Sequence, residues 1–162
     1  GERRVVRLAR YHCRQAGQPA SIDRKFPGLY NARRDNLEKF WRREFGYSHA
    51  VMLVESFYEN VERDGRNAVL HFVPRPVGTM LVACLFAQWT DSAGGEPLLS
   101  FAAITDDPPP EVAAAGHDRM IVNLKPEHVA AWLTPAGRSL EELQGILSDR
   151  QAPFYEHEVL AA

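Results

Sequence analysis

The feature that most constrains this chain is a succession of strand-like runs joined by short turns. Apolar and β-branched residues dominate four runs, at residues 49–61, 68–74, 80–90 and 98–105. Asp64-Gly65 is a tight-turn signal between the first two runs, and the small residues 92–95 separate the last two. Strands joined by short turns pair antiparallel. The sequence therefore predicts an α+β fold, with a mainly antiparallel, curved or barrel-like sheet and helices at its margins.

A helix is predicted ahead of these strands, over residues 35–46. Asp35 with Glu38 three residues later resembles a capping box, and Gly46 stands where a terminator is expected. An apolar stripe at helical spacing runs along this segment and indicates core packing rather than a ligand surface. The stripe comprises Leu37, Phe40, Trp41 and Phe45.

The rest of the chain reads as shorter elements. We expect a strand within residues 3–12, a loop over 15–27, a rigid turn over 106–110 and a strand over 119–124. One helix should start at Pro126, and a capping box at Ser139 should open another that ends near Ser148. A closing strand is predicted over 154–160. The 162 residues carry no internal repeat, and we expect a single domain over 1–162.

The charge is distributed unevenly along the chain. Residues 1–43 contain 12 Lys or Arg against 4 Asp or Glu, whereas the other 119 residues contain 7 against 17. A basic segment beside an acidic remainder predicts a surface that faces a polyanion, with nucleic acid the leading candidate. The alternative is a solvated, arginine-rich face.

Cysteine usage and hydropathy bound the cellular setting. Cys13 and Cys84 stand in unlike contexts, which favours a reducing compartment over a disulfide. The charged start Gly1-Glu2-Arg3-Arg4 lacks a secretory pattern, and no run is apolar enough to span a bilayer. We therefore expect a cytoplasmic protein, nucleoid-associated if prokaryotic, with no membrane partner. The six histidines show no paired metal-ligand spacing, so we expect neither metal nor cofactor.

Two residues have the chemistry of proton transfer. Glu59 lies near the end of an apolar run, where partial burial would raise its pKa toward neutrality. Glu55 would share its face in a regular strand, although for Glu55 the pattern favours a solvent-exposed side chain. His117 follows small residues and precedes a strand, and histidine is suited to proton transfer near pH 7. Each residue taken alone is equally compatible with a structural role.

The segment around Asn31 is polar and basic. Asn31 is expected in a loop before a helix, where asparagine is commonly a turn or cap residue. Arg33 and Arg34 are suited to binding phosphate, or they coat a surface.

These residues, in this order, resemble the SRAP (SOS-response-associated peptidase) family. The resemblance covers residues 28–160 and depends on the order and spacing of short motifs. The motifs are Asn31-Ala32-Arg33, Ser56-Phe57-Tyr58-Glu59, Val82-Ala83-Cys84-Leu85-Phe86, Ile104-Thr105 and His117-Asp118-Arg119-Met120.

The resemblance implies a DNA-damage role, with single-stranded DNA that carries abasic sites as the partner. In the family, a cysteine directly after the initiator methionine is the nucleophile. Its thiol and α-amine condense with the ring-opened sugar aldehyde and form a thiazolidine crosslink. The chain starts without Met-Cys and looks divergent, and we expect the family's N-terminal strands and cysteine segment to be absent from it.

The resemblance also implies roles for individual residues. Asn31 would position the amine, Glu59 would move protons during imine formation, and His117 would assist sugar ring opening. Further residues are expected to bind DNA: Arg33 and Arg119 at phosphates, and Thr105 as part of the lining.

Two other functions stay open at this stage. One is a single-stranded-DNA-binding module without catalysis, using Arg7, Arg10, Arg14 and Arg33 on phosphates. The other is a hydrolase, including a peptidase, that uses Glu59 and His117 on another substrate. The sequence leaves the oligomeric state open.

Overall fold

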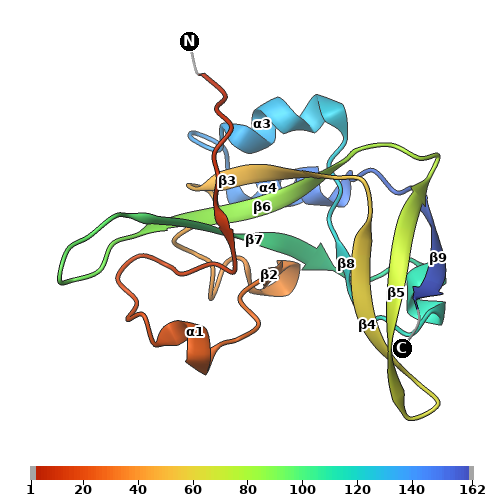
Figure 1. Ribbon diagram of the computed structural model, residues 1–162. Coiled ribbons are helices and arrows are strands. Elements are labelled where there is room, and N and C mark those ends of the chain that lie inside the picture. The colour runs from red at the N-terminus through yellow and green to blue at the C-terminus, as the bar shows by residue number, and fades with distance from the viewer. Residues whose placement is uncertain (1–2, 161–162) are drawn as a thin grey trace.

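The computed structural model describes residues 3–160, and these residues form two sheets with short helices at their margins (Figure 1). The termini of the predicted 1–162 domain, including Gly1, lie outside the described residues. Six strands form the main sheet: β1 (Arg10–Tyr11), β2 (Asn31–Arg33), β3 (His49–Val54), β6 (Met80–Trp89), β7 (Leu98–Asp106) and β8 (Met120–Ile121). A smaller sheet contains β4 (Phe57–Arg63), β5 (Arg66–Arg75) and β9 (Phe154–Leu160). The α+β prediction is confirmed.

Strand β7 organises the main sheet. It pairs antiparallel with β6, and β6 pairs antiparallel with β3. The short strands β1 and β2 pair with β7 in parallel, which makes the sheet mainly but not wholly antiparallel. The Asp64-Gly65 turn joins β4 to β5 as predicted, and both turn residues have positive φ, at 51° and 72°.

The sheet curls where β6 and β7 separate. Their pairing ends at Cys84 and Ala103, and the segment that contains β8 enters the gap. The Ala83 amide donates to the Val122 carbonyl, and the Val122 amide donates to the Ile104 carbonyl, both at 2.9 Å. The inserted segment therefore bonds to both strands, and the main sheet becomes a strongly curled half-barrel.

The predicted single strand over 49–61 is wrong. The chain leaves the main sheet after Val54 and enters the smaller sheet at Phe57, so β3 and β4 belong to different sheets. The break removes the regular alternation that would have put Glu55 on the face of Glu59. Glu55 is exposed, which confirms the prediction of a solvent-exposed side chain.

The predicted helix over 35–46 is also wrong. Only a 3₁₀ turn, η1 (Arg34–Asn36), forms there, followed by irregular hydrogen-bonded turns. The Asn36 carbonyl accepts from the amides of both Lys39 and Trp41, at 3.2 and 3.3 Å, which an α-helix does not allow. Asp35 caps nothing and pairs with Arg33. The stripe nevertheless packs in the core as predicted at Leu37, Trp41 and Phe45, while Phe40 is partly exposed.

The remaining elements differ mainly in length. The predicted strand over 3–12 shrinks to β1, and residues 3–9 are exposed outside any ladder. Helix α1 (Ile22–Lys25) lies in the expected loop over 15–27, and α2 (Pro110–Ala114) follows the proline turn. The two C-terminal helices are confirmed, with η2 (Pro126–His128), α3 (Val129–Leu133) and α4 (Leu140–Ser148). The Ser139–Glu142 capping box is also confirmed. None of the described helices is long and apolar enough to cross a membrane.

The main sheet has a buried core on each face. One face packs against α3, α4 and the turns after η1, and it includes Trp41 and Trp132. The other face packs against the smaller sheet and includes Leu70 and Phe72. Alternating residues of β6 and β7 contribute to the two cores in turn, because successive side chains of a strand point to opposite faces.

His49 is buried in the first core in its neutral form. Its ring lies 3.9 Å from the Trp132 ring, Nδ1 donates to the Trp132 carbonyl, and Nε2 accepts from the Gly46 amide. Burial lowers the pKa of His49 to about 4, although the bond to the Trp132 carbonyl opposes the shift.

This histidine predicts a loss of stability in mild acid. An unfolded histidine titrates near pH 6.5, so between pH 6.5 and 4 the unfolded chain binds the additional proton and is favoured. We expect the His49 contribution to the free energy of unfolding to fall by about 2 kcal/mol between pH 7 and pH 5. Urea unfolding of the wild type and of His49→Asn at both pH values isolates this contribution. Equal pH dependence in the two proteins would contradict it.

Candidate functional site

Glu59 and His117 meet between the two sheets. Glu59 lies on β4, on the face that it shares with Phe57 and Val61, and this face points toward the main sheet. His117 lies in the turn between α2 and β8, after Gly116 at φ +98°. The distance from His117 Nε2 to Glu59 Oε2 is 2.9 Å. The structure therefore brings together two residues that lie 58 positions apart.

Both ring nitrogens of His117 have partners. Nδ1 is 2.8 Å from the Arg119 carbonyl and 3.3 Å from the Arg119 amide. Nε2 is 2.9 Å from Glu59 Oε2, so it is the ring nitrogen through which a proton can pass between the two side chains. A carboxyl and an imidazole in direct contact have the arrangement of an acid–base relay.

The surroundings of Glu59 favour its protonated form. Burial raises the pKa of Glu59 above its ordinary range, and the negative charge of Asp118 raises it further. His117 opposes both effects by its charge and its hydrogen bond. A carboxyl with a raised pKa keeps a proton to donate at a higher pH than an ordinary glutamate does, which is a common property of catalytic acids.

Strands β1 and β2 present a second group of polar side chains to the same space. Asn31 pairs with Ala103 in register and lies in a strand rather than in the expected loop. The Tyr11 hydroxyl donates to Asn31 Oδ1 at 3.3 Å. Burial raises the pKa of Tyr11 to about 12, with further contributions from Cys84 and Glu59. Tyr11 and Asn31 lie opposite Phe101 and Ala103 of β7, which belong to the face of the main sheet that packs against the smaller sheet.

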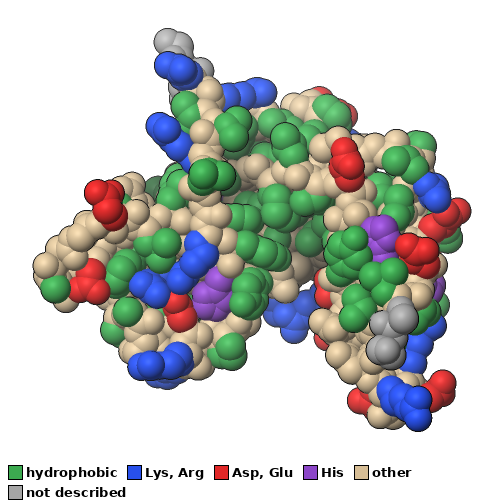
Figure 2. Space-filling model, in the orientation of Figure 1, with side chains coloured by type: hydrophobic (Ala, Val, Ile, Leu, Met, Phe, Trp, Pro, Cys, Tyr) green, Lys and Arg blue, Asp and Glu red, His purple; other side chains and the backbone are tan. Residues whose placement is uncertain are grey.

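Figure 2 shows the surface hollowed between the part formed by β1, β2 and α1 and the part formed by β4 and β5. Tyr11 was not singled out by the sequence analysis. The sequence gives little indication of its position, because that position depends on the pairing of β1 with β7, two strands that lie far apart in the chain.

Thr105 lies deeper on this face. It is 4% exposed, and its hydroxyl has no hydrogen-bond partner among the described residues. Its register partner on β2 is Arg33, and on β8 it is Ile121. A buried hydroxyl without a partner is costly, so Thr105 is an unusual feature of this face.

The candidate phosphate-binding arginines differ in how firmly they are held. Arg33 is exposed and makes two 3.1 Å bonds to Asp35. The Arg119 guanidinium lies 4.0 Å from Asp118, and its side chain is one-third exposed. Both guanidinium groups lie near enough to solvent to meet a phosphate.

Other arginines of the basic segment serve the fold. Arg34 binds Asp106, Gln144 and Ser148, and so joins the end of β7 to α4. Arg10 and Arg14 both bind Asp23.

The cysteines do not contribute a nucleophile to the described site. Cys13 and Cys84 are buried and free, and burial raises the pKa of each thiol to about 12. A thiol with such a pKa is not ionised at neutral pH, and the thiolate is the reactive form. Within residues 3–160, no group of three or more His, Cys, Asp or Glu is arranged to hold a metal ion.

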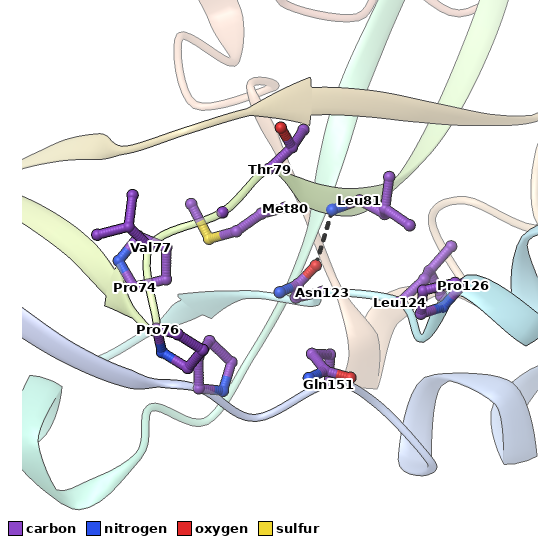
Figure 3. A pocket seen from close by; sticks show the side chains of 12 residues that line it. Pro74, Pro76, Val77, Thr79, Met80, Leu81, Asn123, Leu124, Pro126 and Gln151 are labelled. Atoms are coloured by element: carbon purple, nitrogen blue, oxygen red, sulfur yellow. Dashed lines mark hydrogen bonds between the residues drawn. The ribbon is translucent and has the colours of Figure 1, made fainter.

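Two shallow pockets lie apart from the Glu59–His117 pair. One, of about 240 Å³, lies where Asn123 Oδ1 accepts from the Leu81 amide (Figure 3). The other, of about 420 Å³, lies beside α2 and Arg150. Neither lining includes Asn31, Glu59 or His117.

Comparison with known proteins gives a family match over nearly the whole chain. The family described as SOS response associated peptidase (SRAP) matches residues 3–161. The abasic site processing protein YoaM of Bacillus subtilis (strain 168) is 28% identical over 122 residues, which make up 74% of this chain and 53% of that protein. The chain thus spans about half the length of this curated relative.

Solved structures share the fold at low identity. A protein from Bacteroides thetaiotaomicron superposes with a TM-score of 0.76 and 17% identity, over 93% of this chain and 67% of that one. A protein from Bordetella bronchiseptica gives a TM-score of 0.75 and 17% identity, over 95% and 76% of the two chains. A phage-related protein from the same organism gives a TM-score of 0.61 and 22% identity, over 82% and 63%.

The contacts of Glu59 predict opposite responses to two neighbouring substitutions. His117→Ala removes the partner that lowers the Glu59 pKa, so this pKa should rise further. Asp118→Asn removes a charge that raises it, so the pKa should fall. NMR titration of the Glu59 carboxyl carbon measures both shifts. Shifts of the same sign in the two variants would contradict the described geometry.

Proposed function

Because the chain belongs to the SOS response associated peptidase (SRAP) family, we propose that it processes abasic sites in single-stranded DNA. The family and the similarity to an abasic site processing protein support a role in handling DNA damage. The substrate that we propose is the ring-opened sugar of the abasic site, which carries an aldehyde.

The observation that carries this proposal is the Glu59–His117 pair. A carbonyl condensation needs one group to move protons at the reacting carbon and another at the oxygen that leaves. Two proton-transfer groups 2.9 Å apart support the proposal, because they would meet that need.

The proposed reaction follows from these positions. An amine adds to the aldehyde carbon and forms a carbinolamine, and Glu59 donates a proton to the departing hydroxyl, which leaves as water. His117 takes the proton that the carbinolamine nitrogen loses as the imine forms, and passes it to Glu59. The sulfur then attacks the imine carbon while the thiol proton moves to the imine nitrogen, which closes a thiazolidine ring. His117 also assists opening of the sugar ring, and the Asn31 amide orients the amine.

The nucleophile in this proposal is a cysteine that follows the initiator methionine. It supplies amine and thiol from one residue, which a cysteine inside a chain cannot do. Cys13 and Cys84 are unsuited in any case, since they are buried with high thiol pKa values. The experiments below therefore use the protein with its natural N-terminus.

The DNA contacts are proposed for three further residues. Arg33 and Arg119 would bind phosphates on either side of the lesion through charge-assisted hydrogen bonds. The unpartnered hydroxyl of Thr105 would donate to the bound sugar or phosphate.

Removing the proton donor should slow the reaction. Glu59→Gln keeps the shape of the side chain but cannot exchange a proton with His117. We expect adduct formation with an abasic oligonucleotide to slow by roughly 100-fold or more. Quenched time courses resolved on denaturing gels measure the rate, and Glu62→Gln on the same strand is the matched control. A rate for Glu59→Gln equal to that of the control would refute the role of Glu59.

Removing the hydroxyl of Tyr11 should have a smaller effect. Tyr11→Phe loses the bond that holds Asn31 Oδ1, so the amide is less well oriented. One hydrogen bond of this kind corresponds to a rate loss of about two- to tenfold. Tyr58→Phe, on the exposed side of β4, should react like the wild type. Equal rates for the Tyr11 and Tyr58 variants would show that the hydroxyl of Tyr11 is not needed.

A further inference from the structure

A basic and aromatic patch lies on the surface formed by α1 and the turns after η1. The Lys25 ammonium is 5.5 Å from the centre of the Phe26 ring, and the Phe26 ring is 6.1 Å from that of Phe40. The two rings are 40% and 38% exposed. We call the following six residues the α1 patch: Arg24, Lys25, Phe26, Lys39, Phe40 and Arg43.

The cations of the α1 patch are not neutralised by the surrounding chain. Within the described residues, no carboxylate lies within 4.0 Å of any of the four. The acidic side chains of the same segment bind other groups: Asp23 binds Arg10 and Arg14, Asp35 binds Arg33, Glu38 binds Gln144, and Glu44 binds Gln15. In Figure 2, Lys and Arg side chains lie over α1 and also above it, where they adjoin acidic and histidine side chains. The patch therefore keeps a net positive charge, although the charge of Arg43 also acts on the buried Glu44, where burial raises the pKa and the arginine lowers it.

The exposed rings indicate which kind of polyanion the patch would bind. Phe26 and Phe40 meet edge to face with an interplanar angle of 66°, which leaves ring surface open to solvent. Aromatic faces beside unpaired cations are the elements with which proteins bind single-stranded nucleic acid, through base stacking and phosphate contacts.

The α1 patch is connected to the candidate site by further aromatic residues. Tyr30, which is 45% exposed, immediately precedes Asn31 and follows Phe26 by four residues. Its ring lies 4.7 Å from that of His12 and 5.4 Å from that of Tyr11. The chain thus runs from α1 to Asn31 with exposed rings at intervals.

We propose that the α1 patch binds the single-stranded DNA that flanks an abasic site, on one side of the lesion only. This inference rests on the proposed function, since it takes the lesion to lie at Asn31 and Glu59. The strand leaves the site past Tyr30, stacks a base on Phe26, and places phosphates at Lys25, Lys39 and Arg43. The patch lies on one side of Asn31, so it distinguishes the two directions along the strand.

The test compares oligonucleotides that extend about 12 nucleotides from the lesion on the 5′ side, on the 3′ side, or on neither. Fluorescence anisotropy measures affinity, and gels measure the reaction. Both extensions supply a phosphate beside the lesion, and one of them should raise wild-type affinity clearly more than the other. Phe26→Ala should lower the affinity of that oligonucleotide about tenfold. Lys25→Ala combined with Lys39→Ala and Arg43→Ala should reduce the slope of log affinity against log salt by about 2.

The controls separate this proposal from the proposed function. A control triple variant, Arg63→Ala with Arg66→Ala and Arg138→Ala, removes three exposed cations outside the α1 patch. It should keep the rise in affinity that the extension gives the wild type. The patch variants should react normally with the lesion that has no extension, whereas Glu59→Gln should bind the extended strand normally and react slowly. The inference is overturned if both extensions raise affinity equally, or if the control triple variant loses as much as the patch variant. It is also overturned if polyglutamate competes as well as DNA, since that would indicate an acidic protein partner.

Discussion

The insertion of residues 120–123 between β6 and β7 is the interaction on which the rest of the structure depends. The backbone bonds of Val122 to Ala83 and Ile104 hold the two strands apart at one end. A sheet that is opened in this way curls, because its strands can no longer run side by side to their ends. The curl creates a concave face for the second core, and the same segment places His117 just before it, opposite β4.

The polar groups of the site are held by this framework with little freedom. Asn31 is fixed by the parallel ladder to β7 and by Tyr11, and the His117 ring is fixed by the carbonyl of Arg119. Orientation of this kind lowers the entropy that a reaction must lose when the groups come into position. The positions of these groups therefore do not depend on a bound ligand.

The hairpins were predictable from sequence because their information is local. Asp64-Gly65 fixes the β4–β5 turn, and the Ser139–Glu142 box fixes the start of α4. The break at residues 55–56 was not predictable from local sequence, because it is the point where the chain passes from the main sheet to the smaller sheet. The helix predicted over 35–46 was wrong, but most of the apolar stripe on which that prediction was based does pack in the core. The packing of Trp41 and Phe45 can be met by irregular turns as well as by a helix.

The candidate site, like the fold, was predictable from sequence only in part. Glu59 and His117 could be nominated from residue type and order, but their contact depends on the curl and on the non-local position of β8. Tyr11 escaped notice because its role arises from a two-residue parallel pairing with β7. Asn31 was expected in a loop for the same reason, since parallel pairing leaves no local turn signal.

Successive side chains of strand β7 point alternately to the core under α4 and to the face of the candidate site. Ala102 and Ile104 pack in the core beneath α4, while Phe101, Ala103 and Thr105 face the candidate site. A single inserted or deleted residue would exchange the two sets, and would bury the site side chains while exposing the core. The length of this strand between its two ends is therefore as important to the fold as the identity of its residues.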